Sequence, residues 1–216
     1  MPDSSSGLPK VNRFTPVTIQ EFMTSENKRR EYWEQKKELM AQMGRARPNA
    51  GHIAIARLGS LGKLDGVITQ NIDGLHQMAG LPDECVIELH GTNRTIICMV
   101  CGALEAWEPV HQRLLAGEAI PQCLHCRGII KPNTISFGQA LNPVVLDRAA
   151  RLTQTCDLLL AVGSTLIVEP AASFPRLAKE NGAKLAIINL SETPLDGIAD
   201  VVIHAAAGKI LSDVVE

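Results

Sequence analysis

The 216-residue sequence predicts an α/β fold: a parallel sheet with helices on both faces, plus a small insert built around four cysteines. Two patterns support this prediction. Short apolar runs alternate with helical stretches from residue 64 onward, and two CxxC pairs interrupt the alternation. Apolar residues make up 45% of the chain and charged residues 20%, which is typical of a globular domain with a real core.

The first third of the chain predicts two helices. Ser25 can cap a helix that runs to about Met43 and ends at Gly44. A second helix is expected from Asn49 to Leu58, where apolar residues recur at helical spacing.

Five apolar runs then predict strands, at residues 67–68, 85–89, 157–162, 184–190 and 201–203. Asn142-Pro143 is expected to open a helix before the third run, and Glu169-Pro170 a further helix that closes at Gly182 before the fourth. Strands that are apolar on both faces and alternate with helices favour a Rossmann-like parallel sheet.

Polar clusters follow four of these runs, where a parallel sheet binds its ligands at the carboxyl ends of its strands. Each cluster alone could be an ordinary loop, but the four together predict one binding site. Its candidate residues are Gln70, Asn71, Ile72, Asp73, His90, Gly163, Ser164, Thr165, Asn189, Leu190 and Ser191. His90 ends a strand, precedes the flexible Gly91, and is expected to face the same edge as Asn71 and Asp73.

The two CxxC pairs are separated by 21 residues, a spacing that predicts a four-cysteine zinc ribbon in an insert over residues 93–132. The ligands would be Cys98, Cys101, Cys123 and Cys126. With four thiolates and no open position, the metal would be structural. Redox pairs or disulfides are the alternative, and His125, inside one pair, is expected to be exposed.

Composition excludes several classes of protein. The net charge is −2, and seven residues are aromatic (Trp 2, Tyr 1, Phe 4), so neither a basic field nor a stacking platform for nucleic acid is expected. No run approaches the roughly 18 apolar residues of a membrane span, and the amino terminus lacks the pattern of a secretory signal. We therefore expect a cytoplasmic protein without nucleic-acid or membrane partners.

Several ordered motifs resemble the sirtuins, NAD-dependent protein lysine deacylases. They are TQNIDGLH at residues 69–76, ELHG at 88–91, the two CxxC pairs, KP at 131–132, FGQ at 137–139 and VGSTLIVEPA at 162–171. The last looks like the family's GTSLxVxPA element with Ser and Thr exchanged. The resemblance extends over about residues 15–214.

The resemblance implies the role of each residue. His90 would be the general base, and Gln70, Asn71 and Asp73 would line the nicotinamide-ribose pocket, with Ile72 among them. The adenosine half of NAD would contact Gly163, Ser164, Thr165, Asn189, Leu190 and Ser191. Phe137-Gly138 would form a wall of the acyl-lysine channel. The implied partners are NAD and acyl-lysine proteins, with one structural zinc.

Two departures from the family pattern qualify these expectations. The family opens with a strand and a GAGxS turn leading into PDFR, whereas Ser4 and Ser5 stand where Phe and Arg would follow. We therefore expect an amino-terminally incomplete catalytic domain (residues 1–216) with weak NAD binding. The alternative is an impaired fragment that acts as a zinc-containing interaction module. At the positions of the Tyr-x-x-Arg pair found in sirtuins that take dicarboxylic acyl groups stand Trp33 and Lys36, which favours acetyl-lysine.

Overall fold

The computed structural model describes residues 16–215, so the expectation attached to Ser4 and Ser5 lies outside the described residues. Its first helices begin at polar caps. Helix α1 (Ile19–Thr24) follows Thr18, whose side chain forms a reciprocal capping box with Glu21. Helix α2 (Glu26–Met43) begins after Ser25, whose Oγ accepts from the Lys28 N–H at 3.3 Å, and it ends at Gly44 as predicted.

Helix α3 (Ala50–Ser60) also confirms its prediction. The Asn49 side chain accepts from the His52 N–H at 3.2 Å, so the first turn has a capped donor. Helix α6 (Pro143–Thr155) begins in the same way, since Asn142 Oδ1 accepts from the Val144 N–H at 2.9 Å.

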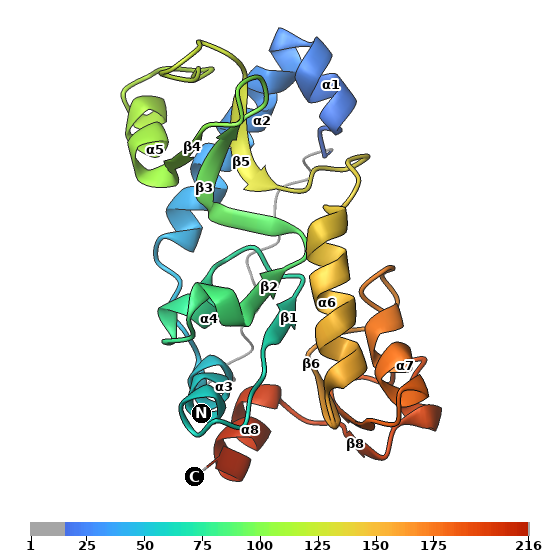
Figure 1. Ribbon diagram of the computed structural model, residues 1–216. Helices are drawn as coiled ribbons and strands as arrows, with labels where there is room; N and C mark the ends of the chain where they lie inside the picture. Colours follow the sequence, from blue (N-terminus) through green and yellow to red (C-terminus); the bar gives the residue numbers. More distant parts are fainter. Residues whose placement is uncertain (1–15, 216) are drawn as a thin grey trace.

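The five predicted strands are all present and all pair in parallel, but they form two sheets (Figure 1). One sheet holds β1 (Val67–Thr69) and β2 (Val86–Glu88). The other has the order β6-β7-β8, from β6 (Leu158–Val162), β7 (Lys184–Ile188) and β8 (Val201–Ile203). Among residues 16–215, β1 pairs only with β2 and β6 only with β7, so each keeps one unpaired edge.

Both faces of the β6-β7-β8 sheet are buried, one by helices and the other by residues of connecting segments. Neighbouring residues of β7 join different core clusters: Ile187 packs with Leu166 and Leu195, whereas Ile188 packs with Ala54 of α3 and Leu211 of α8 (Ala207–Val215). Side chains alternate between the faces of a strand, so this division places apolar layers on both sides.

Helix α7 (Ser173–Glu180) starts later than predicted. A turn occupies the residues after Glu169-Pro170 and is closed by a hydrogen bond from the Ala172 N–H to the Val168 carbonyl oxygen at 3.0 Å. The helix ends before Gly182, as expected.

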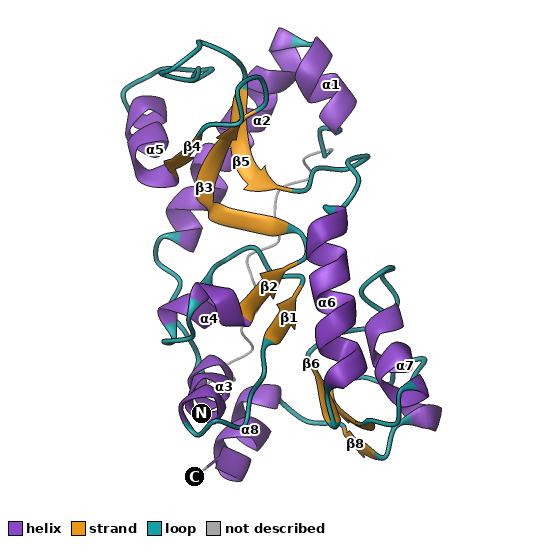
Figure 2. Cartoon of the chain, viewed as in Figure 1, coloured by secondary structure: helices purple, strands orange, loops and turns teal. Residues whose placement is uncertain are grey.

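The insert around the four cysteines contains regular strands and a helix as well as loops. It contains an antiparallel sheet of order β4-β3-β5, from β3 (Gly91–Cys98), β4 (Leu104–Ala106) and β5 (Ile130–Thr134), with helix α5 (Trp107–Leu115) beside it. We call this part the zinc module. Figure 2 shows its strands packed near α2, and Trp33 of α2 shares a core cluster with Ile96 and Ile130.

Three short helices complete the described chain: α4 (Leu75–Met78), η1 (Asp83–Cys85) and η2 (Asp196–Ile198). No helix within residues 16–215 combines the length and hydropathy that a bilayer crossing requires.

Candidate functional site

The first part of the candidate site lies where β1 and β2 end. The residues after β1 include Gln70, and His90 follows β2. Because the two strands are parallel neighbours, these ends adjoin, and His90 Nδ1 lies 3.1 Å from the Gln70 carbonyl oxygen. His90 therefore lies beside the first residue after β1.

This contact determines which nitrogen of His90 carries a proton. A carbonyl oxygen only accepts hydrogen bonds, so Nδ1 must be the donor. In the neutral ring Nε2 then keeps its lone pair and is free to accept a proton. His90 is half-buried, and its own carbonyl accepts from the Ile135 N–H at 2.8 Å, which holds its backbone against the residues after β5.

Residues 70–73 form a turn held mainly through their backbone. The Asn71 N–H donates to Thr69 Oγ1 at 3.0 Å, and the Ile72 carbonyl accepts from the Asn93 N–H at 2.9 Å. Asp73 Oδ1 accepts from the Leu75 N–H at 3.0 Å, at the start of α4. The Asn71 side chain is exposed and has no hydrogen-bond partner among the described residues, so its amide is available to a ligand.

The second part lies where β6 and β7 end. Gly163 has φ +58° and donates its N–H to the Ile188 carbonyl at 2.9 Å, while Ser164 Oγ accepts from the Leu166 N–H at 3.3 Å. Asn189 Nδ2 donates to the Ser191 carbonyl at 2.8 Å. Thr165 and Leu190 are exposed, so this end of the sheet presents polar and apolar groups to solvent.

The candidate residues lie at the strand ends of two different sheets. Gln70, Asn71, Ile72, Asp73 and His90 belong to the β1-β2 end, and residues 163–165 and 189–191 to the β6-β7 end. Within residues 16–215, no hydrogen bond or ion pair connects the two groups.

The FGQ segment forms a tight turn near the first group. Ser136 N–H donates to Gln139 Oε1 at 3.1 Å, and the Gln139 N–H donates back to the Ser136 carbonyl at 3.0 Å. Phe137 is 67% exposed, so its ring is available to line a channel. Gln139 thus shapes the turn from within.

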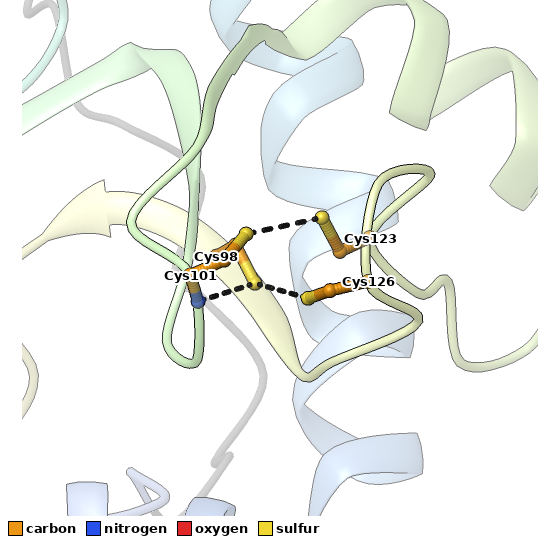
Figure 3. A group of neighbouring side chains, drawn as sticks. All are labelled: Cys98, Cys101, Cys123 and Cys126. Atoms are coloured by element: carbon orange, nitrogen blue, oxygen red, sulfur yellow. Dashed lines mark hydrogen bonds between the residues drawn. The ribbon is translucent and has the colours of Figure 1, made fainter.

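The four cysteines converge at the tip of the zinc module (Figure 3). Their sulfur atoms all lie within 4.8 Å of one another, and the Cys98–Cys126 and Cys101–Cys123 sulfur pairs are 3.5 and 3.8 Å apart. The Cys101 N–H points at Cys98 Sγ at 3.5 Å, and this backbone contact lowers the pKa of Cys98 to about 6.

This cluster fits a zinc ion. Four sulfurs at about 2.3 Å from a tetrahedral zinc lie about 3.8 Å from each other, close to the spacing observed. Backbone N–H groups that favour the thiolate add to the fit. His125 is exposed and outside the cluster, as predicted, so the donor set is four thiolates with no open position.

A cavity of about 390 Å³ opens between α2 and the cysteine-bearing loops, with Arg29, Trp33 and Arg127 among its lining residues. It lies at the Cys98 end of β3, whereas His90 precedes the opposite end of that strand. The cavity is therefore separate from the candidate site.

Sequence reasoning missed a group of residues beneath the 70–73 turn. Arg94 of β3 contacts Gly74 and carboxylates on two other segments. The only signal in the sequence was Gly74 itself, immediately after Asp73. A second contact joins His52 and His76, whose ring centroids are 4.9 Å apart, and burial lowers the pKa of both rings.

Comparison with known proteins identifies the family. Residues 3–170 match the model of the Sir2 family.

The chain belongs to the Sir2 family.

Its relatives match most or all of its length. The NAD-dependent protein deacetylase of Thermodesulfovibrio yellowstonii is 43% identical over 216 residues, 100% of this chain and 84% of the relative. NAD-dependent protein deacetylase 2 of Streptomyces coelicolor is 44% identical over 195 residues, 90% of this chain and 80% of the relative.

Solved Sir2 structures share the fold. A structure described as Sir2 bound to acetylated peptide has a TM-score of 0.84 at 35% identity, covering 91% of this chain and 80% of the other. One described as Sir2-p53 peptide-NAD+ has a TM-score of 0.82 at 34% identity, covering 94% and 85%. The α/β fold predicted from sequence is thus confirmed as that of a sirtuin.

Proposed function

We propose that this sirtuin is an NAD-dependent protein lysine deacetylase. It would transfer the acetyl group from lysine to ADP-ribose and release nicotinamide. The observation that carries the proposal is the contact of His90 Nδ1 with the Gln70 carbonyl at 3.1 Å, which leaves a basic nitrogen beside the 70–73 turn. Relatives and solved structures named for deacetylation, acetylated peptide and NAD support it.

The residues divide the chemistry between them. When bound, NAD would supply a ribose carbon as the electrophile for the acyl oxygen, with nicotinamide as the leaving group. His90 Nε2 would accept a proton from a ribose hydroxyl, a task that suits an imidazole near neutral pH. Asn71 would orient a hydroxyl or water without gaining charge, and the Asp73 carboxylate would accept from the nicotinamide amide. Residues 163–165 and 189–191 would hold the adenosine half.

The experiment is a mass-spectrometric assay of an acetyl-lysine peptide with and without NAD. The proposal expects NAD-dependent loss of acetyl together with stoichiometric nicotinamide and O-acetyl-ADP-ribose. A His125→Ala variant serves as a control, because His125 is exposed and lies in the zinc module. Deacetylation that proceeds equally without NAD, or no turnover of any acetyl peptide, would contradict the proposal.

A second candidate is a sirtuin that binds NAD weakly and acts as a zinc-containing interaction module. Within residues 16–215, β1 and β6 each have one edge with no strand paired to it, a setting that can accept a strand from a partner. Calorimetric titration of NAD into the chain separates the candidates. Micromolar binding supports the deacetylase, and no measurable heat of binding supports the second candidate.

A further inference from the structure

Arg94 packs directly against the turn that carries the site residues. Gly74 has φ +71°, a left-handed conformation, and a Cβ at that position would lie 2.6 Å from Arg94 Cδ. The aliphatic part of Arg94 therefore occupies the space that a side chain at position 74 would need. Position 74 directly follows Asp73.

The Arg94 guanidinium contacts three other side chains. Nη2 donates to Asp83 Oδ1 at 2.7 Å and lies 3.7 Å from Glu88 Oε2. Gln77, with its amide oriented so that both polar atoms find partners, accepts from Arg94 Nη2 at 3.2 Å. The same amide donates to the Gly74 carbonyl at 3.3 Å, so Arg94 reaches the turn by two routes.

Glu88 depends on this cation. Its side chain is only 14% exposed. Burial raises the pKa of Glu88, and Arg94 opposes that rise most, with smaller contributions from Thr92 and Gln77. Loss of the guanidinium would leave a largely buried carboxylate without its countercharge, which is strongly unfavourable.

These contacts connect the two segments that form the first part of the candidate site. Glu88 is the last residue of β2, two residues before His90. Next to Arg94 along β3, the Asn93 N–H donates to the Ile72 carbonyl at 2.9 Å. One side chain therefore contacts both the 70–74 turn and the end of β2.

We propose that Arg94 is a positioning residue that holds the 70–74 turn against the end of β2, so that Asp73 and His90 keep their relative places. The effect of Arg94 on the reaction rests on the proposed function. The claim that Arg94 holds the turn rests on the contacts alone. Arg94 is not expected to touch the substrate.

The test compares two variants. Arg94→Met keeps the aliphatic packing but removes the guanidinium group, whereas Arg94→Lys keeps a positive charge on a single ammonium group. Arg151→Met is the matched control, because Arg151 is an exposed arginine that pairs with Asp147 at 2.8 Å on α6. Hydrogen–deuterium exchange of the amides in residues 72–78 is measured on each full chain. Exchange is expected to accelerate about tenfold in Arg94→Met, less in Arg94→Lys, and not in Arg151→Met.

Kinetics supply the second readout. We expect kcat/KM of Arg94→Met to fall on the order of tenfold to a hundredfold, because small misplacements of reacting groups have large effects. The deficit should grow as pH rises, since protonated Glu88 needs no partner and the carboxylate does. The charged groups that face Glu88 are Arg94 and Asp83. Adding Glu88→Gln to Arg94→Met should remove this pH dependence, which a merely structural defect would not show.

The outcomes are distinct. Exchange and kcat/KM in Arg94→Met equal to those of Arg151→Met would overturn the positioning role while the proposed function stands. If the wild-type chain does not deacetylate, the proposed function fails, and exchange alone then decides whether Arg94 holds the turn. If Arg94→Met does not fold, Arg94→Lys with its intermediate exchange carries the comparison.

Discussion

At the scale of single residues, the tautomer of His90 makes the sharpest prediction. Because the Gln70 carbonyl accepts from Nδ1, Nε2 is the nitrogen to which the proposed function assigns the role of base. We expect His90→Ala to lower kcat by about 10²–10⁴, the usual effect of losing a general base, while NAD affinity changes little. Deacetylation rates and NAD titration check this, with His125→Ala as the control. A variant that keeps more than about half of the wild-type rate would move the role to another residue.

The expected preference for acetyl-lysine also rests on single side chains. Trp33 is 0% exposed within the core, so it cannot contact a substrate. Lys36 Nζ lies 5.4 Å from the Tyr32 ring centroid. Burial lowers the pKa of Lys36, because it makes the charged form of the side chain less favourable. We expect acetyl-lysine to react faster than succinyl-lysine when the two peptides compete. Lys36→Arg should raise the succinyl share, because arginine stays charged and binds carboxylates bidentately. Faster removal of succinyl than of acetyl by the wild type would contradict the expected preference.

At the scale of secondary-structure elements, the close approach of β3 and β5 predicts that a methyl group added at Gly91 lowers the stability of the fold. Gly91 has φ +71°, and a Cβ there would lie 2.1 Å from the Asn133 carbonyl oxygen. Gly62→Ala is the matched control, with φ +66° and nothing within 4 Å of its Cβ. We expect the control to lose about 1–2 kcal/mol from left-handed strain alone. Gly91→Ala should lose clearly more, measured by chemical denaturation. Equal losses would show that β5 moves freely.

The zinc module should depend on its metal. Cys98 and Cys123 are buried in the same core cluster as residues of α2. Loss of the ion should therefore destabilise both the zinc module and its packing against α2. Cys98→Ser is expected to lower bound zinc from about one per chain to near zero and to lower the melting temperature. Cys156→Ser, outside the cluster, should keep its zinc. Metal analysis and thermal unfolding measure both effects. A wild-type fold that contains no metal would contradict this prediction.

At the scale of the whole molecule, Asp200 connects the end of the chain's last parallel crossover to α7 and β7. It accepts from Lys179 Nζ at 2.7 Å, from Lys184 Nζ at 3.1 Å and from the Leu185 N–H at 2.8 Å. Lys179, followed by these other donors, holds the pKa of Asp200 well below its usual range.

A lowered carboxylate pKa contributes stability that is present above the unfolded-state pKa of about 3.9 and is lost as pH falls toward the folded-state value. We therefore expect Asp200→Asn to lower the melting temperature at neutral pH and to approach wild-type behaviour under strongly acidic conditions. Melting curves between neutral and acidic pH decide this. A constant difference across that range would show that Asp200 stabilises the fold without titrating.

The sequence by itself determined the five parallel strands, the helices α2, α3 and α6, and the four cysteines that gather in one cluster. Caps such as Ser25 and Asn142 act through neighbours along the chain, so helix starts follow from local order. The five strands follow from apolar runs, and the CxxC spacing brings two thiolates to each knuckle. The polar residues at strand ends, His90 among them, were equally local signals.

Tertiary structure decided the rest. Which strands pair, and that they form two sheets, depends on contacts between distant segments that no local pattern encodes. The contact that sets the His90 tautomer spans 20 positions along the chain, from residue 70 to residue 90. In the sequence nothing distinguishes Arg94 from other charged residues. Only the packing of the folded chain places it between Gly74, Asp83 and Glu88. Hydrogen bonds and ion pairs act through space, so the partners of a residue emerge only when the chain is folded.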